Sequence, residues 1–243
     1  MTKADFENAR KQMNDYLKVH RVEHHMFYGP ASDEYWLTQP RILVVNMEPY
    51  GYEDCGHVNV DYECLKGWLN DAGKTNTRTV RNSMAIVYAI NDALRRDARP
   101  EPGAIRAARE NQKGLESILA SVAYYNIRPT SNPVKTQDST AIRASGCSPI
   151  SGFILQEMLA LEPFFILVSG IHFLAAFNAM WKLDPPLCFR QRCWYANSIL
   201  IQSISHPSRI CYKEVDETIS GLVAELQQAK RQGRGGNFGF GRG

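Results

Sequence analysis

The segment RILVVNMEPYGYED, residues 41–54, places side chains that can do chemistry directly after an apolar run. The run itself predicts a buried strand. Asn46, Glu48 and Tyr50 then supply an amide, a carboxylate and a phenol within five positions. Pro49 fixes its own φ angle and restricts Glu48 to extended conformations. A carboxylate held in so narrow a backbone range suits a general base, or an anion beside a reacting centre.

Two more apolar segments end in polar side chains. The segment SVAYYN ends in Asn126, and SILIQSI, residues 198–204, is followed closely by His206. His206 directly precedes a proline, as Glu48 does, so its backbone is restricted in the same way. Because ligands of open α/β sheets bind beyond the carboxyl ends of the strands, we expect the carboxylate, the amide and the imidazole to meet at one edge.

Strand and helix patterns alternate along the chain. Helical spacing of apolar residues marks residues 3–19, 79–96, 104–120, 151–163, 171–181 and 214–232. Short apolar runs mark strands at residues 41–45, 121–126, 164–170 and 198–204, with a hairpin arm at 188–196. Gly, Pro and polar residues indicate mostly loop at 51–78 and 129–150. The alternation predicts one α/β domain over residues 1–230, a three-layer α/β/α sandwich with a central, mostly parallel sheet.

The composition is that of an ordinary globular protein, with 44% hydrophobic and 22% charged residues among 243. A net charge of +3 does not require a polyanionic partner, but clustered positive charge would permit one. No apolar run approaches the roughly 18 residues of a membrane helix, and no signal-peptide core is present, so we expect a cytoplasmic location. The six cysteines include no Cys-x-x-Cys pair. Reduced thiols are therefore expected, with no metal and no cofactor.

The tail differs from the rest of the chain. Residues 233–243 hold six glycines, two arginines and two phenylalanines, which cannot form a packed core. We expect residues 231–243 to be flexible. The tail is either a terminus without a role or an arm that contacts nucleic acid through charge and stacking.

The motif NMEPYG, followed far downstream by SHPSR, resembles the two signature motifs of the uracil-DNA glycosylase superfamily. The first resembles the water-activating loop, whose usual forms are Gly-Gln-Asp-Pro-Tyr and Gly-Met-Asn-Pro-Gly. The second resembles the His-Pro-Ser loop that inserts into DNA. AYYNIRP is similar to the strand that brings a base-reading asparagine into the pocket. The likeness covers most of the domain, but it is specific only over these short motifs.

The resemblance implies a monofunctional DNA glycosylase with the α/β/α fold of that family. Glu48 would supply a negative charge near C1′ and activate the water, and His206 would donate a hydrogen bond to the departing base. Asn126 would read the Watson–Crick edge of a base flipped out of the helix. The walls of the pocket would be formed by Asn46, Met47 and Tyr50.

The same resemblance implies contacts with DNA, either single-stranded or duplex with a flipped base. Ser208 and Arg209 would contact phosphates. Ile210 stands where the family has its apolar wedge, although core packing explains it equally well. An aromatic ring should stack on the base, and the sequence does not choose among Tyr52, Tyr62 and Trp68. We expect a monomer that does not bind membranes and, in a bacterium, associates with the nucleoid.

Two positions depart from the family pattern. Glu48 is one methylene longer than the usual Asp or Asn, and Asn46 replaces the usual glycine. Changed pocket walls leave open a bulkier or chemically decorated base, such as those that some viruses place in their DNA. The enzyme would then serve defence against phage rather than base excision repair.

Two other classes of protein stay open. One is a non-catalytic nucleic-acid-binding protein on a degenerate glycosylase fold, with a working tail. The other is a nucleosidase or phosphate-handling enzyme that acts on small molecules. The chain contains no phosphate-binding P-loop, no Gly-x-Ser-x-Gly elbow and no His-Glu-x-x-His zinc motif, which disfavours triphosphatases, serine hydrolases and zinc hydrolases.

Overall fold

The computed structural model describes residues 2–22, 25–46, 57–70, 75–127, 148–170, 174–196, 198–207 and 211–232. Its main sheet has six strands in the order β2–β5–β3–β6–β8–β7. Their bounds are Gly29–Pro30 (β2), Ile42–Asn46 (β3), Val122–Asn126 (β5), Phe165–Ser169 (β6), Arg192–Tyr195 (β7) and Ile199–Ile204 (β8). The inner strands β5, β3, β6 and β8 are parallel, and β2 and β7 pair antiparallel at the edges. The predicted α/β class with a mostly parallel sheet is confirmed.

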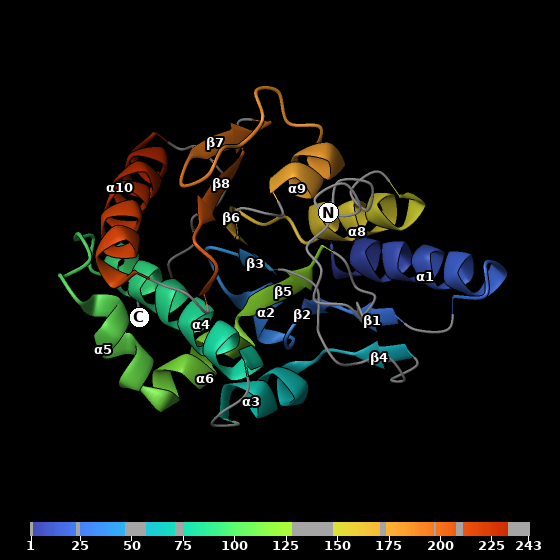
Figure 1. The fold of residues 1–243 in the computed structure, drawn as a ribbon, viewed down its shortest axis with the longest axis horizontal. Helices are drawn as coiled ribbons and strands as arrows, with labels where there is room; N and C mark the ends of the chain where they lie inside the picture. Colours follow the sequence, from blue (N-terminus) through green and yellow to red (C-terminus); the bar gives the residue numbers. More distant parts are fainter. Residues whose placement is uncertain are drawn as a thin grey trace.

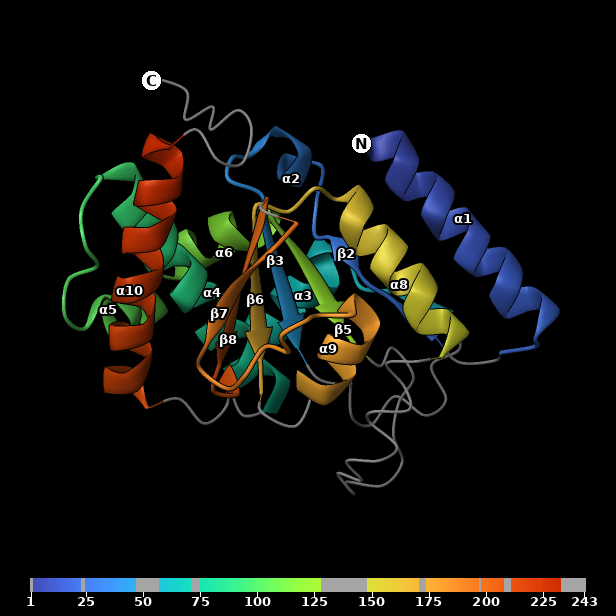
Figure 2. The same cartoon turned by 90° about the horizontal axis from the view of Figure 1, so that it is seen from above.

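Helices cover both faces of this sheet, as Figures 1 and 2 show. On one face, α10 packs against α4 and α5, and α4 packs against α3, α5 and α6. On the other face, α8 packs against α1 and α9. The bounds are Lys3–Val19 (α1), Glu34–Leu37 (α2), Tyr62–Asn70 (α3), Thr75–Arg95 (α4), Ala104–Glu110 (α5), Gln112–Ala120 (α6), Pro149–Ala160 (α8), Leu174–Trp181 (α9) and Tyr212–Arg231 (α10). The sheet therefore lies between two helical layers.

The inner strands are apolar along their whole length because both of their faces are covered. Every residue of β3, β5, β6 and β8 is buried. Parallel strands covered by helices on both sides read as unbroken hydrophobic runs rather than as alternating patterns. For this reason their sequence alone located them within about a residue.

Several elements differ from the expectation. The segment 51–78, expected to be mostly loop, contains α3, the start of α4, and the strand β4 (His57–Asn59), which pairs with β1 (His25–Phe27). The helix expected over 104–120 is two helices, because Asn111 leaves the helical conformation and its side chain caps α6 at the Gly114 N–H, 3.0 Å away. The hairpin arm is confirmed as β7. Of the loop predicted over 129–150, residues 129–147 lie outside the described residues, whereas Pro149 and Ile150 begin α8. Of the tail predicted to be flexible from residue 231, Arg231 is the last residue of α10, and residues 233–243 lie outside the described residues.

A buried ion pair joins α1 to α8. The Arg10 guanidinium donates to both carboxylate oxygens of Glu157, with Nη2 at 3.0 Å from Oε2. The Tyr125 hydroxyl of β5 donates to the same Oε2 at 2.9 Å, and Arg10 also donates to the Tyr28 carbonyl. Burial raises the pKa of Glu157, and the bonds from Arg10 and Tyr125 oppose that rise. The cluster ties both helices to the sheet.

None of the described helices is long and apolar enough to cross a membrane. Four described cysteines carry free thiols: Cys64, Cys188, Cys193 and Cys211. Burial raises the pKa of the Cys64 and Cys193 thiols. Cys55 and Cys147 lie outside the described residues.

Candidate active site at the carboxyl edge of the sheet

The four parallel strands end at one edge of the sheet, which faces the viewer in Figure 1. In register, Asn46 of β3 lies beside Asn126 of β5, and Ser169 ends the neighbouring strand β6. Along the chain, β3 is followed by β5 and then by β6 and β8. In the sheet, β5 lies on one side of β3, whereas β6 and β8 lie on the other side. Open α/β sheets bind ligands at such a reversal, beyond the carboxyl ends of the strands.

Asn46 is buried at this reversal, with 2% of its surface exposed. Its Oδ1 accepts a hydrogen bond from Ser169 Oγ. The Tyr124 hydroxyl, whose pKa burial raises, lies beside the same amide. Yet no hydrogen bond of acceptable geometry satisfies Asn46 Nδ2 within the described part of the chain. An unsatisfied buried donor costs about 1–3 kcal/mol, which is why such groups usually meet a water or a ligand.

Asn126 is held from the side of β2. Its Nδ2 donates to the Tyr28 hydroxyl over 2.6 Å, and that hydroxyl donates to Met26 Sδ over 3.4 Å. No described residue hydrogen-bonds the Oδ1 of Asn126. The amide is thus fixed at one end and keeps an acceptor at the other.

His206 lies at the same edge, two residues beyond the end of β8, and is half-buried. Its turn is fixed from α4, because Asn82 Nδ2 donates to the Pro207 carbonyl over 2.5 Å. Asn82 is 3% exposed, and the proline that follows the histidine is buried as well. The imidazole is therefore carried on a braced turn rather than on a free loop.

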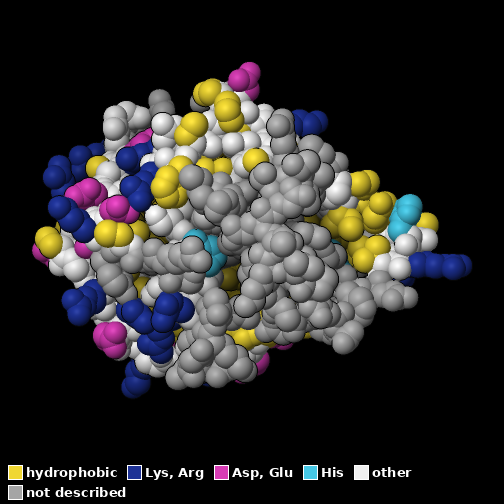
Figure 3. Space-filling model, in the orientation of Figure 1, with side chains coloured by type: hydrophobic (Ala, Val, Ile, Leu, Met, Phe, Trp, Pro, Cys, Tyr) yellow, Lys and Arg dark blue, Asp and Glu magenta, His cyan; other side chains and the backbone are white. Residues whose placement is uncertain are grey.

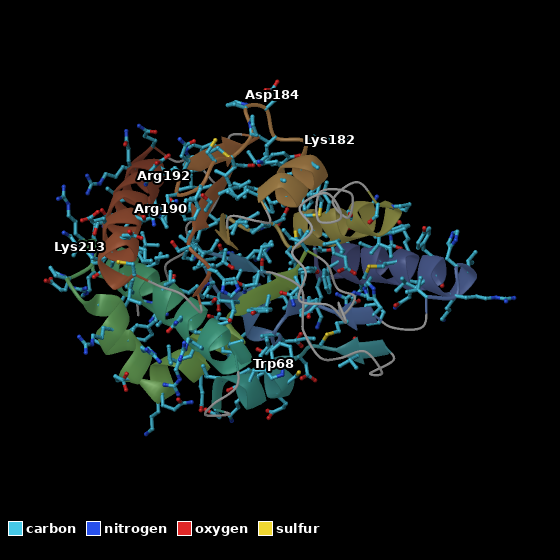
Figure 4. All side chains as sticks on the ribbon, viewed as in Figure 1. Trp68, Lys182, Asp184, Arg190, Arg192 and Lys213 are labelled. Atoms are coloured by element: carbon cyan, nitrogen blue, oxygen red, sulfur yellow. The ribbon has the colours of Figure 1, made fainter. Side chains whose placement is uncertain are left out.

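The structure brings together part of the predicted site. Asn46 and Asn126 are neighbours, and His206 shares their edge. The other predicted site residues lie outside the described residues: Met47, Glu48, Tyr50, Ser208, Arg209 and Ile210. Among the stacking candidates, Tyr52 also lies outside them, while Tyr62 and Trp68 are on α3, partly buried against the core. Figure 4 labels Trp68 on that helix.

Three supporting residues were missed by the sequence analysis. Ser169 had a signal, because it is the polar end of a predicted strand. No sequence pattern pointed to Tyr28 or Asn82. Tyr28 precedes an edge strand of only two residues, and Asn82 lies in a helix that was recognised only by its apolar stripe. Their roles depend on contacts between segments far apart in the chain.

Basic side chains gather on one side of this edge. Figure 3 shows Lys and Arg, interspersed with Asp and Glu, over α10 and the helices beside it, and Figure 4 labels Arg190, Arg192 and Lys213 near that helix. Arg190 pairs with Glu214, and Arg192 Nε lies 3.5 Å from a Glu225 oxygen. Lys213 forms no ion pair with another described residue.

A surface pocket of about 580 Å³ opens between β7 and α10, lined by Arg192, Trp194, Glu225 and Gln228 among others. The Trp194 indole N–H donates to Glu225 over 2.7 Å. Most of the pocket's α10 residues lie in the second half of that helix, which runs away from the carboxyl edge of the sheet (Figure 2). The pocket therefore lies apart from the strand-end amides, and we assign it no part in the site.

No protein-family model matches the chain, and a search of curated proteins finds no match. Within the described ranges, no group of three or more His, Cys, Asp or Glu side chains is placed to hold a metal ion. The relationship to the uracil-DNA glycosylase superfamily thus stays a prediction that depends on two short motifs.

Proposed function

We propose that the protein is a monofunctional DNA glycosylase, which hydrolyses the N-glycosidic bond of a flipped-out uracil or modified base and leaves an abasic site. One observation carries the proposal: Asn46, Asn126 and the turn bearing His206 share the carboxyl edge of one parallel sheet. Two amides side by side suit the polar edge of a base. An imidazole at the same edge suits stabilisation of the base as it leaves.

The proposed mechanism divides the charge that develops when the bond breaks. Positive charge grows on the sugar and negative charge on the base. Glu48, two residues after Asn46, supplies the negative charge near C1′ and orients the attacking water. His206 donates a hydrogen bond to the departing base, and Asn126 holds the edge of that base. The water oxygen bonds to C1′ and its proton passes to the Glu48 carboxylate, while the bond between C1′ and the base nitrogen breaks and the base leaves with its electron pair.

Base release by the purified chain is the decisive measurement. DNA carrying uracil, deaminated bases and hypermodified bases is incubated with the protein, and free base is read by mass spectrometry. We expect one or more bases to be released, with alkali-labile abasic sites left in the strand. A Glu48→Gln protein, purified in parallel, should release none, because it keeps the shape of the side chain and loses the charge.

Three outcomes contradict the proposal. If the original protein and Glu48→Gln release base equally, either a contaminating enzyme is responsible or Glu48 takes no part in the reaction. DNA binding without release from any substrate favours the non-catalytic binding protein. Hydrolysis of free nucleosides, with polymer DNA ignored, favours the nucleosidase instead.

The tail provides a separate prediction about DNA affinity. Deleting residues 233–243 should weaken binding to single-stranded DNA and flatten its salt dependence. Two arginine contacts correspond to a change of roughly 1.4 in the slope of log affinity against log salt concentration. Fluorescence anisotropy over a salt series measures this slope, and a variant with Arg234 and Arg242 replaced by alanine is the matched control. An unchanged slope in both variants excludes a nucleic-acid role for the tail.

A further inference from the structure

We propose that Tyr28 is a positioning residue that fixes the amide of Asn126 in the base pocket and thereby sets which base edge the pocket accepts. The inference rests on the proposed function and deepens it, because it assigns a role to a residue outside every motif of the sequence. Tyr28 does not touch the reacting atoms. It acts through Asn126, to which it is hydrogen-bonded.

The hydrogen bond between Asn126 and Tyr28 is short and buried. Asn126 Nδ2 and the Tyr28 hydroxyl are 2.6 Å apart, and the residues are 6% and 2% exposed. The hydroxyl has only one proton, which faces Met26 Sδ at 3.4 Å, so its lone pairs are available to the amide. A buried hydrogen bond of this kind restrains the torsion of the asparagine before a ligand arrives.

Tyr28 is itself held in place from three directions. The next residue, Gly29, pairs with Tyr124 in the antiparallel ladder between β2 and β5. The Tyr28 carbonyl accepts a hydrogen bond from Arg10, which is fixed by the buried carboxylate of Glu157. The ring packs near Tyr124, with the centroids 6.3 Å apart. The tyrosine therefore cannot move independently of the strand that ends in Asn126.

The consequence is a defined chemical preference. With Nδ2 engaged by Tyr28, Asn126 presents Oδ1, which accepts a hydrogen bond from an N–H of the base. Beside it, Asn46 has Oδ1 engaged by Ser169, and its Nδ2 lies near the Tyr124 hydroxyl without a hydrogen bond of good geometry, so we take Nδ2 as the donor that Asn46 presents to the base. The pocket thus matches a base edge that carries an N–H next to an acceptor atom. A base methylated at that nitrogen leaves Oδ1 buried and unpaired, and it should be rejected.

The free protein tests the contact without any substrate. In ¹⁵N-labelled protein, the side-chain NH₂ signals of Asn126 are assigned by their loss in Asn126→Ser. Tyr28→Phe should shift both protons and speed their exchange with water. Tyr35→Phe is the matched control, because Tyr35 is also fully buried and its hydroxyl also donates one hydrogen bond, to Leu161 O at 3.1 Å. Unchanged Asn126 signals in Tyr28→Phe overturn the proposal, whatever the enzyme does.

Activity tests the consequence on the base identified by the release screen. Tyr28→Phe should lower kcat/KM roughly tenfold, the worth of one neutral hydrogen bond, and should reduce discrimination against the N-methylated base. Tyr35→Phe should change thermal stability by a similar amount and leave this discrimination intact. If the original protein, Tyr28→Phe and Tyr35→Phe are all active and reject the N-methylated base equally, Tyr28 has a structural role only. If no base is released but the Asn126 signals shift in Tyr28→Phe, the glycosylase function and the role in specificity are both overturned. The hydrogen bond between Tyr28 and Asn126 is then still confirmed.

Discussion

Replacing His206 by alanine is expected to slow base release by about 10²–10³-fold while DNA affinity stays within a few-fold of the original. Removal of a single donor to a developing anion typically has a cost of this size. The imidazole is suited to that role because its turn is braced: Asn82 of α4 holds the carbonyl of Pro207, the residue that follows. Single-turnover release of the base measures the effect, because it separates bond cleavage from release of the product.

A second histidine provides the control for this variant. His20 is exposed at the end of α1, where its ring packs on Tyr16 with the centroids 4.1 Å apart. His20→Ala should leave base release unchanged. A His206→Ala protein that binds DNA, melts normally and releases base at the original rate contradicts the assigned role. If His206→Ala loses DNA affinity and base release to the same extent, His206 contacts DNA rather than the departing base.

The inner sheet could be predicted from the sequence because helices cover it on both faces. Burial on both sides requires apolar residues at every position, so β3, β5, β6 and β8 appear as unbroken runs. The edge strand β2 has two residues, too few for any pattern. The helix α3 was missed although Leu65 and Leu69, four residues apart, are fully buried, because the surrounding Gly, Asn and Asp residues favoured a loop.

The site was predictable to the extent that strand topology determines it. Parallel strands bring their last residues to one edge, which is why Asn46 and Asn126 could be expected to meet. Their hydrogen-bond partners could not be expected. Tyr28 reaches Asn126 across 98 positions, and Ser169 reaches Asn46 across 123. Such pairings follow from packing between distant segments, and no local pattern encodes them.

Replacing Glu157 by alanine should lower the free energy of unfolding by about 3–5 kcal/mol, the usual cost of leaving one member of a buried ion pair without its partner. The Glu157 side chain is 0% exposed and that of Arg10 19% exposed, so water can replace the lost carboxylate around the guanidinium only in part. The Tyr125 hydroxyl also loses its acceptor. For a chain of this size the loss corresponds to a decrease in Tm of roughly 6–20 °C. Urea unfolding followed by circular dichroism measures the free energy directly.

Two companion variants decide whether this loss comes from the orphaned charge. The double variant Arg10→Met/Glu157→Leu should recover most of the stability, because a buried ion pair can usually be replaced by apolar side chains of similar volume. Asp92→Asn, which breaks the exposed pair with Arg96 at 2.7 Å, should cost only about 0.3–0.5 kcal/mol. A double variant no more stable than Glu157→Ala would show that the packing between α1 and α8, rather than the charge, is what the substitution damages.

Because Arg10 also holds the Tyr28 carbonyl, the recovered double variant should still lose discrimination between base edges. Stability and specificity would then be separated in one protein.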